Sequence, residues 1–103
     1  MSGRLTLVVM LHVNRGREAE FERFETAAAA ILRRHGGAIE RRIAVEPAGE
    51  TARPTEVHIV TFPDPAAFER YRADPDLAPL AALRADAIRE TIVWLGADRA
   101  PFA

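Results

Sequence analysis

The stretch Leu5–Val13, with the sequence LTLVVMLHV, is apolar at almost every position and ends at the turn-forming residues Asn14-Arg15-Gly16. A short run rich in Val and Leu is typical of a strand that is buried on both faces. The stretch Thr55–Phe62, with the sequence TEVHIVTF, has the same character and stops at Pro63. Because both runs carry apolar residues at odd and at even positions, we predict two central strands of one sheet.

Between these two strands the spacing of apolar residues changes twice. Over Arg17–His35 apolar residues recur at spacings of three and four, as in an amphipathic helix, and Gly36-Gly37 is expected to end it. Ala38–Val45 alternates apolar and charged residues, as a half-buried edge strand does, and Glu46–Pro54 is a predicted loop. The helical stripe consists of Phe21, Phe24, Ala28, Ile31 and His35, while Glu20, Glu22, Glu25 and Arg33 are expected to face away.

The remaining chain begins with two helix-start signals. Asp64-Pro65 and Asp74-Pro75 each place a capping Asp before a Pro at the first helical position. The first helical piece carries Phe68 and Tyr71 inward, and the two pieces are expected to form one bent crossover. Leu77, Leu80, Ala81 and Arg84 share a face of the second piece. A last strand is predicted over Ile88–Leu95.

The order of elements is therefore βαββαβ, which predicts an α+β protein with the ferredoxin-like sandwich fold. In that fold a four-stranded antiparallel sheet carries both helices on one face, and right-handed crossovers place the first and third strands in the centre. We expect one domain over residues 1–103 with an ordered core at about 5–96.

A single sheet face covered by helices leaves the other face open, and that face is predicted to be apolar as well. In the first strand the two parities are Leu7, Val9 and Leu11 against Val8, Met10 and His12; in the third they are Val57, Ile59 and Thr61 against His58, Val60 and Phe62. An apolar patch of this kind marks an interface. We therefore predict a homodimer that packs sheet against sheet into an α/β barrel, with a cavity between or beneath the sheets.

The composition excludes several kinds of chemistry. The 103 residues include no Cys and no Lys, and the one Ser is Ser2. Thiolate nucleophiles, Cys-ligated metals, Schiff bases and a Ser-His-Asp triad are therefore excluded, and we expect no metal and no cofactor. A net charge of −1 with intermixed signs argues against nucleic acid and membrane partners, and we expect a cytoplasmic protein.

Two histidines are the candidate catalytic residues. His12 and His58 lie on neighbouring central strands, are expected to face one another, and would supply a general base near neutral pH. The alternative is that they are buried histidines hydrogen-bonded to their neighbours.

Arg84 either binds a substrate carboxylate or pairs with Glu90 or Asp86. The candidate ligand-binding residues are Arg84, Trp94, Tyr71, Phe62 and Met10; Glu56 and Glu90 are expected to face solvent, and His35 to sit at a helix C-terminus.

A family resemblance adds to this interpretation. The motifs are Phe62-Pro63-Asp64, Ala67-Phe68, Tyr71, the segment Asp74-Pro75-Asp76-Leu77-Ala78-Pro79-Leu80, and Leu83-Arg84. Together with Gly16 and Gly36-Gly37 they resemble a domain-of-unknown-function family of the dimeric α/β-barrel superfamily, alongside the antibiotic-biosynthesis monooxygenases. The resemblance implies a dimer whose two ferredoxin-like sheets form a barrel. It implies no single reaction, because the superfamily includes cofactor-free oxygenases, isomerases, lyases and haem-handling proteins. Leu77 stands where relatives often carry Tyr.

Two functions follow from these observations. The first is a cofactor-independent monooxygenase, isomerase or lyase that removes a proton from a small, largely apolar metabolite. The second is a non-catalytic dimer that binds a small ligand or has only a structural role, because the sequence contains no complete catalytic motif.

Overall fold

Four antiparallel strands form one sheet in the computed structural model, which describes residues 3–47 and 53–102. The strands lie in the order β2-β3-β1-β4, so the first and third strands are central, as predicted. Residues 48–52 of the expected loop Glu46–Pro54 lie outside the described part of the chain. The elements are β1 (Leu5–Val13), α1 (Glu18–Arg34), β2 (Ala38–Ala44), β3 (Glu56–Phe62), α2 (Pro65–Arg72), the 3-10 helix η1 (Pro75–Leu80), α3 (Ala81–Ala87) and β4 (Ile88–Gly96).

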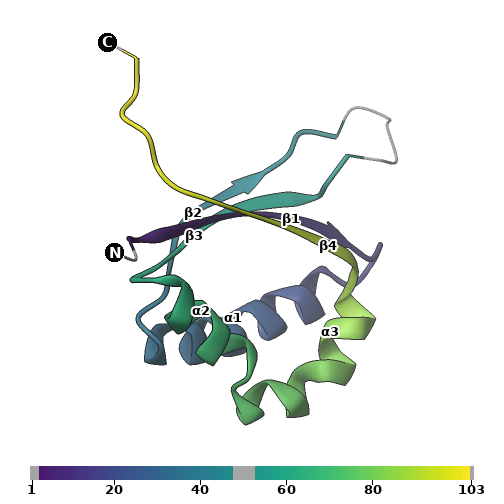
Figure 1. The fold of residues 1–103 in the computed structure, drawn as a ribbon. Helices are drawn as coiled ribbons and strands as arrows, with labels where there is room; N and C mark the ends of the chain where they lie inside the picture. Colours follow the sequence, from purple (N-terminus) through teal and green to yellow (C-terminus); the bar gives the residue numbers. More distant parts are fainter. Residues whose placement is uncertain (1–2, 48–52, 103) are drawn as a thin grey trace.

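All helices lie on one face of the sheet, which we call the covered face; the opposite face is the open face (Figure 1). The pairing of β1 with β3 places Leu7 opposite Val60 and Val9 opposite His58. Because side chains alternate along a strand, one parity of each strand belongs to each face. The covered face therefore carries Leu7, Val9, Leu11, His58, Val60 and Phe62, and the open face carries Val8, Met10, His12, Val57 and Ile59.

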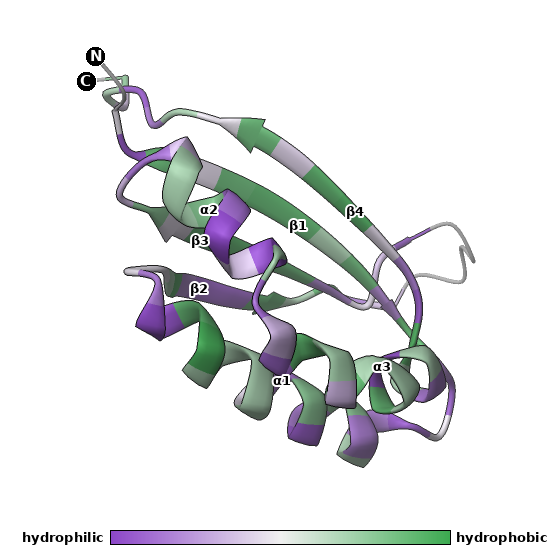
Figure 2. Ribbon diagram, turned by 60° about the horizontal axis from the view of Figure 1, so that its bottom comes forward, coloured by the Kyte–Doolittle hydropathy of each residue, from purple (hydrophilic) through white to green (hydrophobic). Residues whose placement is uncertain are grey.

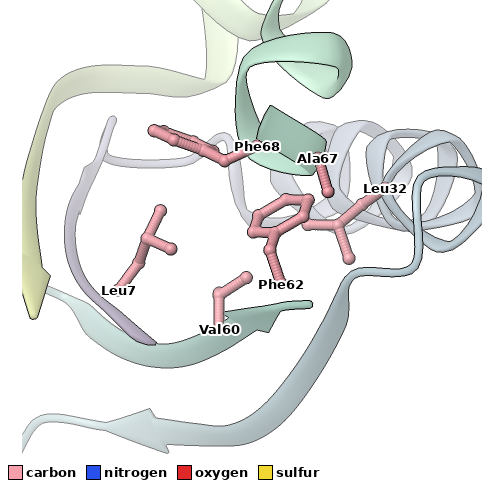
Figure 3. Close-up of a cluster of buried hydrophobic side chains, with 6 residues drawn as sticks. All are labelled: Leu7, Leu32, Val60, Phe62, Ala67 and Phe68. Atoms are coloured by element: carbon pink, nitrogen blue, oxygen red, sulfur yellow. The ribbon is translucent and has the colours of Figure 1, made fainter. Parts of the chain in front are cut away.

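Two apolar clusters join the covered face to the helices. In the first, Phe62 is 1% exposed and points from β3 toward Leu32 of α1 and Ala67 of α2 (Figure 3). Its ring centroid lies 5.3 Å from that of Phe68 and 5.7 Å from that of Tyr71. The second cluster lies at the other end of the layer and contains Leu11, Phe21, Phe24, Ala28, Ala87 and Ile88. The first cluster holds α1 and α2 on the sheet, the second holds α1 and α3, and Val9 packs against both.

Local signals in the sequence set where the helices begin and end. Gly36 has φ +79°, a left-handed conformation that ends α1 and that a residue with a Cβ rarely adopts. Asp64 caps α2, since its carboxylate accepts a hydrogen bond of 2.8 Å from the Ala67 amide. Asp74 caps η1 in the same way, with 2.9 Å to the Asp76 amide. The predicted caps at both Asp-Pro sites are confirmed.

The second crossover differs from a plain bent helix in its middle. Residues Pro75–Leu80 form a 3-10 helix before α3 continues the chain. Pro79 lies inside this segment and has no amide proton, so it cannot complete an α-helical turn there. The predicted face of this segment is confirmed, because Leu77, Leu80, Ala81 and Arg84 all turn toward the same cavity.

A bulge in β2 changes which of its side chains face the helices. The pairing of β2 with β3 places Ile39 opposite Val60, but Arg41, not Glu40, lies opposite Ile59. One extra residue in a strand reverses the alternation beyond it. Arg42 consequently lies opposite His58, on the covered face, whereas the regular alternation predicted from the sequence would have left it with Glu40.

Candidate active site

A cavity of about 420 Å³ lies between the covered face and the helix layer. Most of its lining is apolar and comes from all four strands, from α1 and from the second crossover. Val93 of β4 lines it and is 42% exposed, so the cavity opens beside this edge strand. The polar side chains that line it are Glu25, His58, Tyr71, Arg72, Arg84 and Thr91. A largely apolar cavity with a few polar groups is typical of a small-molecule site.

His58 lies in this cavity between two carboxylates. Its Nε2 is 2.9 Å from Glu56 Oε1, and its Nδ1 is 3.6 Å from Glu25 Oε1. Glu56 is in turn held by Arg42, whose Nε and Nη2 donate to its two oxygens at 2.7 and 2.8 Å. Arg42 also contacts Glu22 on α1, so the side chain ties the edge strand to the helix. The imidazole ring, 3% exposed, is therefore fixed in one orientation.

The two carboxylates differ in their protonation equilibria. Burial raises the pKa of Glu25, helped by the negative charge of Glu56 and opposed mainly by His58. Burial acts in the same direction on Glu56, but the hydrogen bonds from Arg42 and His58, with their charges, outweigh it and lower its pKa. An ionised Glu56 can only accept, so Nε2 of His58 carries a proton toward it. In the neutral ring, the lone pair of Nδ1 then faces Glu25.

A second polar group lies nearer β4. Arg84 Nη2 donates a 2.8 Å hydrogen bond to Thr91 Oγ1. Tyr71, half-buried, lies on the α2 side, and burial, together with the charge of Glu25, raises the pKa of its phenol, while Arg84 opposes the shift. The charges of Glu25 and Arg84 thus act on the same side chain of the cavity lining.

The structure brings four predicted site residues together, namely His58, Arg84, Tyr71 and Phe62. The other predicted site residues, Met10, Trp94 and His12, lie on the opposite face of the sheet. Met10 pairs with Val57 and Ile92 on the open face, and Trp94, which pairs with Val8, is 59% exposed there. Neither lines the cavity. Two further expectations are wrong: Glu56 faces His58 rather than solvent, and Arg84 pairs with neither Glu90 nor Asp86, which contact His12 and Arg17 instead.

The expectation that His12 and His58 face one another is also wrong. In the β1–β3 register Val9, not His12, lies opposite His58, and His12 has the parity of the open face. There it is 4% exposed and accepts a 3.2 Å hydrogen bond at Nδ1 from Arg89, while its Nε2 lies 3.7 Å from Glu90. This ring therefore lies on the face opposite the cavity and does not line it.

His35 lies at the C-terminus of α1, as predicted, with Nε2 2.7 Å from Asp74 Oδ2. Its hydrogen bond is the main cause of a lowered pKa of Asp74. The contact joins the end of α1 to the start of η1.

Sequence reasoning missed Glu25 and Thr91. Glu25 was expected to face away from the apolar stripe, but it lies four residues after Phe21 and seven before Leu32, on the buried side of α1. That spacing was visible in the sequence, whereas the cavity beside it was not. Thr91 belongs to β4, and only its pairing with Leu11 assigns it to the covered face.

The described residues contain neither a metal-binding cluster nor a membrane-spanning helix. In 3–47 and 53–102 no group of three or more His, Cys, Asp and Glu side chains could hold a metal ion. Nor does any helix within these ranges have the length and hydrophobicity that crossing a membrane requires.

Comparison with known proteins gives a family and a fold. The family model described as "Domain of unknown function (DUF1330)" matches residues 7–97. No curated protein matches the sequence. Among solved structures, the chain is similar to SnoaB, a cofactor-independent oxygenase from Streptomyces nogalater. That match has 25% identity over 97% of both chains and a TM-score of 0.72.

Two further solved structures share the fold at lower identity. One is a protein of unknown function from Rhodopseudomonas palustris, with 15% identity over 98% of this chain and 86% of that chain and a TM-score of 0.79. The other is a dimeric protein of unknown function with a ferredoxin-like fold from Bacteroides fragilis. It has 12% identity over 91% of this chain and 95% of that chain, with a TM-score of 0.65. These likenesses show the ferredoxin-like fold predicted from the sequence.

Proposed function

The chain belongs to the DUF1330 family of domains of unknown function, and we propose that it is an enzyme that removes a proton from carbon in a small, largely apolar metabolite. The observation that carries this proposal is the apolar cavity of about 420 Å³ with His58 held between Glu56 and Glu25. A buried, oriented imidazole is the usual proton acceptor in general base catalysis.

Each partner of His58 has a separate task in this step. Glu56 holds the proton on Nε2, so that the lone pair of Nδ1, on the side of Glu25, accepts a proton from the substrate. Glu56 also stabilises the imidazolium that forms, and Arg42 keeps Glu56 ionised and in place. Glu25, whose pKa is raised by burial, can share the transferred proton with Nδ1 and return it.

The carbanion left by proton removal has more than one possible fate. Return of the proton to a different carbon gives an isomerase, and loss of a leaving group gives a lyase. Addition of the carbanion to O₂, followed by loss of water from the hydroperoxide, leaves a carbonyl at that carbon; this cofactor-independent monooxygenase reaction is the one that the similarity to the SnoaB oxygenase favours. All three begin with the same proton transfer, so the roles of His58 and Glu25 do not depend on this choice.

We also propose that two copies pair through their open faces. This face presents Trp94 at 59% exposure and Ile43 at 37%, beside the half-buried Val8, Met10 and Ile59. A continuous apolar face of this kind is typical of a homodimer interface. The dimeric neighbour from Bacteroides fragilis has the same fold and supports the proposal.

Hydrogen–deuterium exchange at carbon tests the enzyme whichever of the three products it forms. A panel of enolisable ketones and phenols is incubated with the protein in D₂O, and deuterium incorporation and oxygen uptake are followed. We expect the wild type to accelerate exchange of at least one compound. His58→Ala should lower that rate by about 10²–10⁴-fold, the usual contribution of a general base.

His12→Ala is the matched control, because this histidine is equally buried but lies on the other face of the sheet. It should retain the wild-type exchange rate. Equal rates for wild type and His58→Ala would contradict the proposal. Binding of the panel compounds with no exchange by the wild type would favour the non-catalytic ligand-binding dimer instead.

A further inference from the structure

We propose that the cavity takes an elongated carboxylic acid with an apolar body, and that Arg84 and Thr91 bind its carboxylate. This inference names the substrate class of the site proposed above and rests on that proposed function.

The two guanidinium groups that line the cavity differ in their partners. Arg72 pairs with Glu69, with Nη1 3.2 Å from Oε1, and lies 5.4 Å from the ring centroid of Phe68. Arg84 makes its hydrogen bond with a neutral hydroxyl, and no carboxylate of the described residues forms an ion pair with it. A cation that faces a ligand cavity with only a hydroxyl as partner is suited to an anionic ligand.

One carboxyl group shares the cavity with Arg84. Glu25 is the acidic side chain among the cavity-lining residues, and its pKa is raised by burial. The neutral form of Glu25 is therefore easier to populate than that of an exposed glutamate. Arg84 opposes the raised pKa of both Glu25 and Tyr71, so its positive charge acts within the cavity in which a ligand anion would lie.

Arg84 and Thr91 together present several donors to one end of a ligand. The Thr91 hydroxyl accepts from Arg84 Nη2, which leaves its own proton to donate onward. The guanidinium retains further N–H groups in a planar fork that matches a carboxylate. Because α3 supplies one group and β4 the other, the contact between them orients both before a ligand arrives.

The position of this pair sets the shape of the ligand. Thr91 lies on β4 and His58 on β3, with β1 between them. Two strand spacings separate the two residues by about 10 Å across the sheet. Between them the covered face presents Val9 and Leu11, and the helix layer adds Leu77 and Leu80. A ligand that reaches both ends therefore has an apolar body, with its carboxylate remote from the carbon at His58.

The test compares two probes of the same size, 3-phenylpropanoate and its uncharged amide 3-phenylpropanamide. Binding to the full chain at neutral pH is measured by NMR titration, following the Arg84 side-chain N–H and the Thr91 amide. We expect the acid to bind about tenfold more tightly than the amide, the effect of a charge-assisted hydrogen bond. Arg84→Gln should remove that preference, and Thr91→Val should reduce it.

Arg70→Gln is the matched control, because it removes the same charge from the exposed surface of α2, outside the cavity lining. It should keep the full preference for the acid. Equal affinity for acid and amide, no binding of the acid at millimolar concentration, or an unchanged preference in Arg84→Gln would overturn the inference.

Failure of the proposed enzyme would look different. His58→Ala lacks the proton acceptor but keeps Arg84 and Thr91, so it should still prefer the acid over the amide. A preserved preference for the acid, with no carbon exchange in any variant, would overturn the proposed reaction while supporting the carboxylate site.

Discussion

The two faces of the sheet carry almost the same kinds of side chain but have different surroundings. Each face is apolar along β1 and β3, and each contains one buried histidine, His58 on the covered face and His12 on the open face. Figure 2 shows the apolar character of β1 and β4 along much of their length. His58 lies beside a cavity between two carboxylates, whereas His12 is hydrogen-bonded by Arg89. Strand composition therefore does not distinguish the two histidines; the elements packed against each face do.

The faces also differ in what their apolar side chains contact. On the covered face Phe62 is 1% exposed within one chain, because α1 and α2 pack on it. On the open face Trp94 is 59% exposed. The first face contributes to the stability of the single chain, and the second is available for association with another chain.

The largest expected effect separates the two faces by stability. Phe62→Ala should lower the free energy of unfolding by about 3–5 kcal/mol, because it removes a buried ring and leaves a cavity. Trp94→Ala should change it by only about 0.5 kcal/mol at low protein concentration, where association does not contribute. Urea unfolding followed by circular dichroism measures both values. Equal losses would mean that the faces do not differ in this way.

A smaller effect is expected on association through the open face. Trp94→Glu introduces a charge into the proposed interface and should weaken the dimer by about 2 kcal/mol or roughly 30-fold, as loss of a central aromatic contact does. Light scattering over a dilution series measures the dissociation. Ala30→Glu adds the same charge to the exposed side of α1 and should leave the dimer intact. A wild-type protein that is monomeric throughout the series would contradict the pairing.

The smallest expected effects are on the free energy of unfolding. They come from substituting the two carboxylates beside His58, and they have opposite signs. The pKa of Glu25 is raised in the folded protein, so its ionisation reduces stability as pH rises through that pKa. Glu25→Gln should therefore be more stable than wild type at neutral pH by about 1 kcal/mol, as removal of a destabilised site residue commonly is. This advantage should disappear as pH falls below the ordinary value of 4.5.

Glu56→Gln should have the opposite effect on stability at neutral pH. The pKa of Glu56 is lowered on folding, so its stabilising contribution is present above the ordinary value of 4.5 and is lost as pH falls through the folded pKa. The variant should lose about 1 kcal/mol at neutral pH, and the difference should shrink in acid. Urea unfolding from neutral pH to about pH 3 measures both variants. The same sign for both would contradict the assigned pKa directions.

The local elements were predictable because their signals are short-range. The bounds of β1 are as predicted, the caps at Asp64 and Asp74 are confirmed, and the face shared by Leu77 and Arg84 lines the cavity. Periodicity and capping depend on residues a few positions apart, and a sequence displays these directly.

The site was predictable only in part, because its geometry depends on register. His58, Arg84, Tyr71 and Phe62 were identified by residue type and periodicity and do line the cavity. The error over His12 arose because the pairing of Val9 with His58 is a relation between two strands. Arg42 reaches Glu56 because the β2 bulge reverses the alternation of its side chains, and no residue type in Ala38–Ala44 indicates this bulge.

The sequence by itself determined the βαββαβ order, two apolar central strands, and the absence of Cys and Lys, so that imidazole, carboxylate and one phenol are the main acid–base groups. Only the tertiary structure decided which histidine meets which carboxylates. Alternation along a strand assigns each side chain to one of two faces, but the pairing register and the helix layer decide what lies on each face. The surroundings of His58 depend on Glu25, 33 positions earlier in the chain, and on Arg42, 16 positions earlier, which holds the Glu56 carboxylate beside the ring.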